Sequence, residues 1–416
     1  VYSNSTLSVA DSKFINNNAI TGGPIYANEG ESTISNSTFS YNDAYEGGAI
    51  YNNGSSSTVT GSGFAYNTAK YGGAIYNDAE DAFIKGTTFT ANNAEHGGAI
   101  YNMEYIDISN SKFENNTAKY GGAIDSYDIG LDIRNTDFTN NTATEYGGAI
   151  YNENSEIDVA HSNFTNNTAE YGGAIENRYY ITMDNCRLEN NNAKYGGAID
   201  NDLGEATIEN TEFTQNTAVY GGAIYNDNGK TTIKNTDFTQ NTARYGGAVR
   251  VYEGEVIIEN ADFTNNSAAV YGGAIDNDLG EATIENANFT QNTARYGGAI
   301  SNDGKATING SKFTANNATE GKAIQTETDI SISNSEFISN GEDCIDVGGD
   351  AKITLNNISS DVQLVNDTIS MKILEAEDVI YGNDVNIKVQ VKSSAIAPLN
   401  SGKVVVKINN VEYSDD

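Results

Sequence analysis

Three carboxylates near the end of the regular part of the chain could carry out acid–base chemistry. They are Glu342, Asp343 and Asp346. Two carboxyl groups held about 5–10 Å apart can cleave a glycosidic bond, one as acid and the other as base or nucleophile. The two histidines, His96 and His161, lie between two and three repeats apart and share no evident carboxylate or nucleophile. Glycoside chemistry at 342–346 is therefore the enzymatic alternative that the sequence offers.

A second set of side chains is suited to binding. Tyrosines precede a Gly-Gly pair in most repeats and follow the Gly-Gly-Ala-Ile segment in several. By strand alternation the second group should face outward, and tyrosines stacked on a flat sheet offer rigid, amphipathic contact area for glycans or proteins. The alternative is that the rings only cover the backbone and stack on one another. The predicted ligand-binding residues are Tyr26, Tyr51, Tyr76, Tyr101, Tyr151 and Tyr225.

These residues belong to a repeat that fills most of the chain. Gly-Gly pairs recur 24 to 26 residues apart from Gly22 to Gly297. A Phe-x-x-Asn motif recurs in the same phase from Phe14 to Phe337, with Leu188 replacing phenylalanine once. A fixed period of this length is typical of a solenoid.

Residue types decide which solenoid this is. The repeat is rich in Asn, Thr, Gly, Tyr and Ile, which form turns and strands. A Gly-Gly pair would cost about 2 kcal/mol inside a helix, so helical repeats are excluded, and the ladder of a leucine-rich repeat is missing. We therefore predict an all-β coil of three short strands. About fourteen coils, stacked in parallel about 4.8 Å apart, give a rod near ~65 Å long.

Two kinds of column should hold the coils together. The two aliphatic side chains and the phenylalanine of each coil point inward and stack on their equivalents. Identical asparagines at strand spacing can bond one another because the amide carries both donor and acceptor. The Phe-x-x-Asn column should form one such ladder. A second is predicted for Asn28, Asn52, Asn77, Asn102, Asn152, Asn177, Asn201, Asn226, Asn277 and Asn302.

The pattern changes near residue 360. Residues 1–360 are predicted to form the β-helix, and residues 361–416 a second domain. There, Val385–Val391 and Val404–Ile408 alternate apolar with polar residues, which is typical of antiparallel strands with one solvated face. An immunoglobulin-like β-sandwich segment is predicted, shorter than the usual ~100 residues. Because the chain starts at Val1 in mid-repeat, we expect a fragment of a larger exported protein.

Charge and hydropathy limit the partners. The formal net charge is −34, which argues against nucleic acid and favours solubility. No run approaches eighteen apolar residues, so no membrane-spanning segment is expected. No cofactor and no dedicated metal site are expected. Acidic residues such as Asp78, Asp202 and Asp227 could bind surface Ca²⁺ weakly, or could form a solvated edge.

Two motifs resemble known families. Gly-Gly-Ala-Ile paired with Phe-x-x-Asn resembles the repeat of chlamydial polymorphic outer-membrane proteins. The longer Asn-Asn-Thr-Ala-x-Tyr-Gly-Gly-Ala-Ile-Tyr-Asn, followed by an Ig-like segment, is similar to adhesin-like surface proteins of methanogenic archaea. The resemblance implies a right-handed parallel β-helix of the pectin-lyase-like class, displayed outside the cell for attachment.

A third resemblance concerns the candidate carboxylates. The segment 341–345, Gly-Glu-Asp-Cys-Ile, resembles the Gly-Asp-Asp-Cys-Ile segment that carries catalytic carboxylates in polygalacturonase-like glycoside hydrolases. The Gly-His-Gly and Arg-Ile-Lys segments that accompany it in that family are missing from this sequence.

The sequence thus predicts a non-catalytic, monomeric cell-surface adhesin. Its elongated rod would present a lateral face to glycans or proteins of a host or partner cell. The alternative is a polysaccharide-active enzyme, polygalacturonase- or lyase-like, that uses the carboxylates at 342–346.

Overall fold

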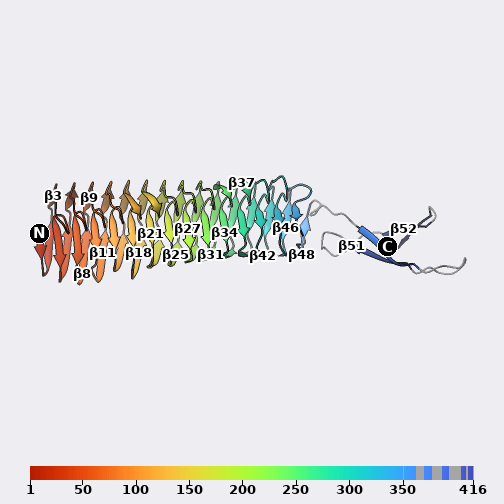
Figure 1. The fold of residues 1–416 in the computed structure, drawn as a ribbon, viewed down its shortest axis with the longest axis horizontal. Coiled ribbons are helices and arrows are strands. Elements are labelled where there is room, and N and C mark those ends of the chain that lie inside the picture. The colour runs from red at the N-terminus through yellow and green to blue at the C-terminus, as the bar shows by residue number, and fades with distance from the viewer. Residues whose placement is uncertain (350, 362–369, 377–386, 393–403, 409–410, 416) are drawn as a thin grey trace.

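Three parallel sheets run the length of a rod. The computed structural model describes residues 1–349, 351–361, 370–376, 387–392, 404–408 and 411–415. Fifteen strands make up each sheet, stacked along one axis (Figure 1). Sheet A runs from β1 (Tyr2–Ser3) to β47 (Ile345–Val347), sheet B from β2 (Leu7–Ala10) to β48 (Ile353–Asn356), and sheet C from β3 (Lys13–Ile15) to β49 (Ser359–Ser360). The all-β fold with three strands per coil and about fourteen coils is confirmed, and no described residue is helical.

One coil illustrates the rest. It consists of β10 (Ile75–Asn77) in sheet A, β11 (Asp81–Lys85) in sheet B and β12 (Thr88–Thr90) in sheet C. Ile75 pairs in register with Ile50 and Ile100 of the neighbouring coils, and Phe89 pairs with Phe64 and Phe113. Equivalent residues therefore lie directly above one another.

The phenylalanine column forms the centre of the core. Phe39 and Phe64 stack with ring centroids 4.7 Å apart and planes within 4°, and the same geometry repeats along the rod. Leu188 is buried in the same column. Burying each such side chain contributes about 1.5–3 kcal/mol, and the predicted inward columns are confirmed.

Each Gly-Gly pair marks a turn that only glycine fits. Gly72 has a φ of +63°, and a Cβ there would lie 2.0 Å from the carbonyl oxygen of Ile75. A Cβ on Gly73 would lie 2.1 Å from the carbonyl oxygen of Gly98 in the next coil. The first glycine supplies a left-handed backbone and the second allows neighbouring coils to approach closely.

The Phe-x-x-Asn column forms the predicted ladder. Asn67 Nδ2 donates to Asn92 Oδ1 at 2.9 Å and to the carbonyl oxygen of Phe39 at 3.0 Å. Asn92 Oδ1 also accepts from the backbone N–H of Asn67 at 3.1 Å. The side chain is buried and the pattern repeats from Asn17 to Asn340. The amide suits this position because its oxygen accepts from the preceding coil while its two N–H groups donate to the next asparagine and to a backbone carbonyl.

The second asparagine ladder is confirmed in part. Asn77 Nδ2 donates to Asn102 Oδ1 at 2.9 Å, but Asn52 pairs in register with Asn77 without a hydrogen bond between the two side chains, since the Oδ1 atoms of both have no partner. Asn152, Asn177, Asn201 and Asn226 are linked at 2.7–2.8 Å. The prediction is wrong for Asn28, because Ala27 rather than Asn28 pairs in register with Asn52. Asn28 instead pairs with Asn53, one position further along the strand.

Beyond residue 360 the described strands pair antiparallel. β50 (Ser370–Ala376) pairs with β51 (Ile387–Lys392), and β52 (Val404–Ile408) pairs with β53 (Val411–Asp415). Residues 393–403 and the contacts of an Ig-like sandwich lie outside the described residues, and the domain boundary at 360 stays a prediction. Within the part of the chain that the structure describes, no helix is long and apolar enough to cross a membrane.

Candidate functional site

The outer face of sheet A carries the side chains that the sequence singled out. We call the residue that follows the buried aliphatic of each strand the sheet file. Strand alternation turns this residue away from the core. The sheet file comprises Tyr2, Tyr26, Tyr51, Tyr76, Tyr101, Asp125, Tyr151, Glu176, Asp200, Tyr225, Arg250, Asp276, Ser301, Gln325 and Asp346.

Two further files flank it. The rim file is the residue two positions after each sheet-file residue, and it includes Asp78, Arg178, Asp202, Asp227, Asp278, Asp303 and Glu327. The turn file is the residue before each first turn glycine, and it comprises Thr21, Glu46, Tyr71, His96, Tyr120, Tyr146, Tyr171, Tyr195, Tyr220, Tyr245, Tyr271, Tyr296 and Glu320.

Four predicted tyrosines form a half-buried row in which the first three rings stack and the fourth is tilted by 44°. Tyr26, Tyr51, Tyr76 and Tyr101 follow one another with ring centroids 4.9, 4.7 and 5.2 Å apart. They face outward from the sheet and are partly buried. Burial raises the pKa of Tyr76 to about 12, so its hydroxyl stays protonated and can donate a hydrogen bond.

The other two predicted tyrosines are covered. Tyr151 is 4% exposed and Tyr225 is 7% exposed. Turn-file rings close over each of them, with Tyr120 6.0 Å from Tyr151 and Tyr195 5.5 Å from Tyr225. Any direct contact with a partner therefore falls to the first four tyrosines.

Acidic sheet-file residues are buried in the same way. These side chains point away from the core, yet the exposed fractions of Asp125, Glu176, Asp200 and Asp276 are 1%, 0%, 2% and 5%. Burial raises the pKa of the Asp125 carboxyl to about 6 and that of Asp276 to about 7. The turn file folds back over the sheet, so an outward-pointing side chain is not a solvated one.

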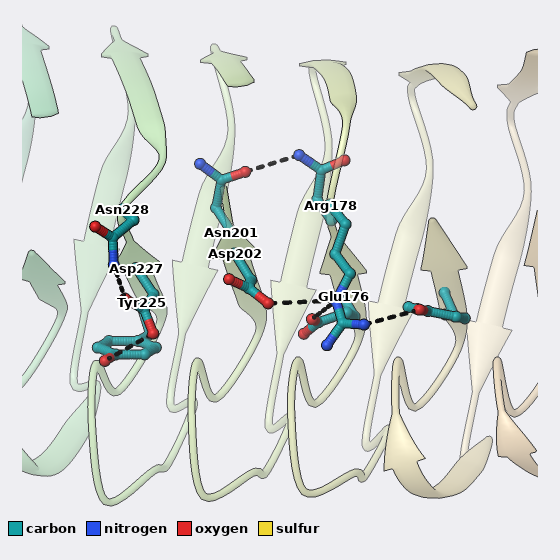
Figure 2. Close-up of polar contacts among 9 residues, drawn as sticks. Glu176, Arg178, Asn201, Asp202, Tyr225, Asp227 and Asn228 are labelled. Atoms are coloured by element: carbon teal, nitrogen blue, oxygen red, sulfur yellow. Dashed lines mark hydrogen bonds and ion pairs between the residues drawn. The ribbon is translucent and has the colours of Figure 1, made fainter. Parts of the chain in front are cut away.

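Arg178 neutralises part of this acidic row. Its Nε donates to Glu176 Oε1 at 3.1 Å and lies 3.3 Å from Asp202 Oδ2. Figure 2 shows the guanidinium reaching between these two carboxylates. Its Nη1 donates to the Tyr151 hydroxyl at 3.1 Å, and its Cζ lies 4.3 Å from the centroid of the Tyr146 ring. The guanidinium is held by carboxylates on one side and by tyrosines on the other.

Arg250 repeats this arrangement three coils later. Its Cζ lies 4.9 Å from the ring centroids of both Tyr220 and Tyr245. Nη1 lies 3.3 Å from Asp276 Oδ2, and Nη2 donates to Asp278. The chain thus twice places a guanidinium between turn-file rings and the carboxylates of the sheet and rim files.

Glu176 and Asp200 form a carboxyl pair. They are neighbours in register on β24 (Ile175–Asn177) and β27 (Ile199–Asp202). Burial raises the pKa of both side chains. Glu176 Oε2 and Asp200 Oδ1 have no protein partner unless a proton lies between the two groups. Two buried carboxyls this close share one proton because both cannot ionise at low cost.

A cleft lies where the sheet-file residue is the short side chain of Ser301. Its volume is about 620 Å³. Tyr271 and Tyr296 line it together with Ser301, Asp303 and Glu327. A second concavity, of about 920 Å³, lies at the turn from sheet A to sheet B.

His96 has a carboxylate partner that the sequence reading missed. Its Nδ1 lies 2.8 Å from Asp125 Oδ2, and its ring lies between Tyr71 and Tyr120 at 5.0 and 4.6 Å. The prediction that the histidines share no carboxylate is wrong here, because a turn-file residue contacts the sheet file of the next coil. His161 lies elsewhere, exposed at a turn with a φ of 51°.

The carboxylates at 342–346 do not line the cleft. Glu342 and Asp343 are exposed, and Asp343 has a φ of 58°. Asp346 is half-buried on β47 beside Gln325, and burial raises the pKa of its carboxyl. Among the residues with described positions, no three His, Cys, Asp or Glu side chains gather as a metal-binding group.

Comparisons with known proteins agree with the geometry of the coils. Residues 221–370 match the model of a right handed beta helix region. The repeat of the Chlamydia polymorphic membrane protein matches residues 110–127, 135–153, 161–178 and 210–227. No protein with a curated description matches the chain.

One solved structure resembles the chain at low similarity. It is described as a new PL6 alginate lyase in complex with a trisaccharide. The two chains are 12% identical, the match covers 93% of this chain and 86% of that one, and the TM-score is 0.32, which carries no functional information. The chain is therefore a right-handed β-helix repeat protein whose coils are similar to the Chlamydia polymorphic membrane protein repeat.

Proposed function

We propose that this protein is a non-catalytic cell-surface adhesin whose contact surface is the outer face of sheet A. The observation that carries the proposal is the continuity of that face. Tyrosines recur at coil spacing along it, from the row Tyr26–Tyr101 to the cleft beside Tyr296. Rigid aromatic side chains give contact area at low entropic cost. The similarity to a repeat of a membrane protein supports a location at the cell surface.

A periodic face suits attachment through many weak contacts. Equivalent side chains repeat about every 4.8 Å along the sheet. A partner with its own repeating groups can engage several coils at once, and avidity then exceeds the affinity of any single contact. The net charge of −34 disfavours strongly anionic partners and keeps the rod soluble.

Three of the carboxyls whose pKa is raised by burial are paired with a basic side chain, which supports a structural role for them. Asp276 is paired with Arg250, Asp125 with His96, and Glu176 with Arg178. The exposed Glu342 and Asp343 lie apart from the cleft. A screen of acidic and neutral polysaccharides for new reducing ends or unsaturated products tests the enzymatic alternative. Turnover that Asp343→Asn abolishes would overturn the proposal.

Adhesion is tested by changing the half-buried tyrosine row of sheet A. We expect binding to cells or immobilised glycans and proteins to weaken in the triple variant Tyr51→Ser, Tyr76→Ser, Tyr101→Ser. The matched control is Tyr41→Ser with Tyr66→Ser, a stacked and exposed pair outside sheet A. Circular dichroism verifies that both variants fold. Equal binding by the triple variant and the control would remove the tyrosine row from the contact surface.

A further inference from the structure

We propose that the cleft over Ser301 binds a guanidinium group, the side chain of an arginine on a partner protein. The inference rests on the proposed function and deepens it, because it names the chemistry of the partner. It is carried by a comparison within the chain: two coils earlier, similar surroundings hold the protein's own Arg250.

The internal site shows what the surroundings bind. The Arg250 guanidinium lies against the turn-file rings of its own coil and of the preceding coil, Tyr245 and Tyr220, at 4.9 Å from each. Carboxylates of the following coil, Asp276 and Asp278, pair with its two terminal nitrogens. Arg178 is held by the same kinds of group. A planar cation between rings and carboxylates is therefore a recurring solution on this face.

Two coils beyond Arg250 the two rings and the rim-file carboxylate return without the arginine, and Gln325 stands where Asp276 stands beside Arg250. Arg250, Asp276 and Ser301 occupy the same position on successive strands β34 (Val249–Tyr252), β38 (Ile275–Asp278) and β41 (Ile300–Asn302). The turn-file rings of Ser301's own and preceding coils are Tyr296 and Tyr271, which stack at 5.1 Å. Serine is too short to fill the space that an arginine fills, and the cleft of about 620 Å³ results.

The carboxylates of this cleft are available to a ligand. Arg250, Asp276 and Asp278 also line it, and the charge of Arg250 is offset by its ion pairs with these two carboxylates. Asp303, Glu320 and Glu327 line it as well, and in the described chain none of these three pairs with a lysine or arginine. The Gln325 amide donates to Glu327 Oε1 at 2.8 Å and fixes that carboxylate beside the cleft.

Charge decides between ligand classes. An anionic polysaccharide would bring carboxylates against three unpaired carboxylates, and like charges at short range repel. A guanidinium gains from both the rings and the carboxylates. It is more weakly hydrated than an ammonium and stacks flat on aromatic faces, so arginine should bind in preference to lysine.

The test uses short peptides. The full chain is titrated with acetyl-Gly-Arg-Gly-amide, with the citrulline peptide of the same shape and no charge, and with the lysine peptide. Binding is followed by ligand-observed NMR at low ionic strength. We expect the arginine δ-methylene protons to shift upfield, because they lie over tyrosine rings. We also expect the citrulline peptide to bind about tenfold more weakly.

Variants locate the binding. Ser301→Arg places the chain's own guanidinium in the cleft and should abolish peptide binding while the thermal midpoint is kept or raised. Glu327→Gln and Asp303→Asn should each weaken binding, which remains informative if Ser301→Arg does not fold. The matched control is Glu285→Gln, an exposed acid on β39 (Glu281–Glu285) of sheet B, and it should bind as the unmodified chain does.

Each contrary outcome is specific. Equal binding of the citrulline peptide, no binding of the arginine peptide, or undiminished binding by Ser301→Arg would overturn the arginine site. Attachment to cells that persists in Ser301→Arg would overturn its part in adhesion and leave the proposed function intact. Peptide binding without any attachment to cells would overturn the proposed function and leave the site.

Discussion

Glu176 and Asp200 lie side by side on neighbouring strands of sheet A, with both carboxyl groups buried and one oxygen of each without a hydrogen-bond partner in the protein. On a solvated sheet such a pair would ionise. Here turn-file rings and Arg178 cover it, so burial sets its protonation. The same cause acts at Asp125 and Asp276, and the predictions that follow depend on it.

Stability should fall as the pH rises. Burial raises the pKa of Asp276 from 3.8 to about 7 and that of Asp125 to about 6. In this pH range the folded state therefore binds more protons than the unfolded state, and the free energy of unfolding decreases with pH. Stability from these carboxyls is fully present below pH ~4 and is lost by pH ~7, at about 1.4 kcal/mol for each unit of pKa difference.

Guanidinium unfolding between pH 4 and pH 8 measures this dependence. The double variant Asp125→Asn, Asp276→Asn should reduce its slope, because the two neutral amides no longer take up protons in this range. The double variant Glu176→Gln, Asp200→Asn should reduce it further, because burial raises the pKa of these two carboxyls as well. A midpoint that rises steadily from pH 4 to pH 8 would contradict the prediction.

Removing the Arg178 side chain should destabilise the rod. Arg178→Ala leaves Glu176 and Asp202 without their cation, and an uncompensated buried carboxylate costs about 3 kcal/mol. The loss should be larger at pH 8 than at pH 5, because protonation of Glu176 relieves it. Arg187→Ala is the control, since Arg187 is half-exposed and its ion pairs are on the surface. Surface pairs contribute about 0–1 kcal/mol. Thermal unfolding at both pH values separates the two variants.

Breaking the buried amide ladder should be equally costly. Asn141→Ala removes the acceptor of Asn116 Nδ2 and of the Asn116 backbone N–H, and the donor to the carbonyl oxygen of Phe113. Each buried group left unsatisfied costs about 1–3 kcal/mol. Asn163→Ala, which removes only an exposed bond to Asp137, should change stability by less than about 0.5 kcal/mol. Hydrogen exchange should show lost protection around residue 141, and equal effects of the two substitutions would contradict this.

The stacked columns of the core could be predicted from the sequence, because they follow from the length of the repeat alone. Once Phe64 and Phe89 are placed in phase, stacking follows, and so do the ladder through Asn67 and the left-handed turn at Gly72. The second ladder was predicted wrongly at Asn28. Ala27 takes the ladder position in that coil, and the spacing of the repeat does not show which residue of a strand pairs with the neighbouring strand.

The character of the binding face was not readable in the same way. Strand alternation shows which side of sheet A a residue such as Asp125 or Tyr225 faces, but not what covers it. The covering rings come from the turn file of the preceding coil. Because of this shift by one coil, His96 contacts Asp125, which belongs to the next coil. Aligning the turn file against the sheet file of the next coil would have revealed this contact. The cleft over Ser301 depends on side-chain volume as well, which periodicity does not contain.

The buried amide ladder also gives the rod a direction. Every asparagine of this ladder from Asn17 to Asn316 donates a hydrogen bond from its Nδ2 to the Oδ1 of the asparagine in the following coil. Reversing one coil would set two oxygens, or two NH₂ groups, against each other. Head-to-head joining of two such rods is therefore disfavoured at this column. A further coil of the same direction would extend the row of hydrogen bonds at either end of the ladder.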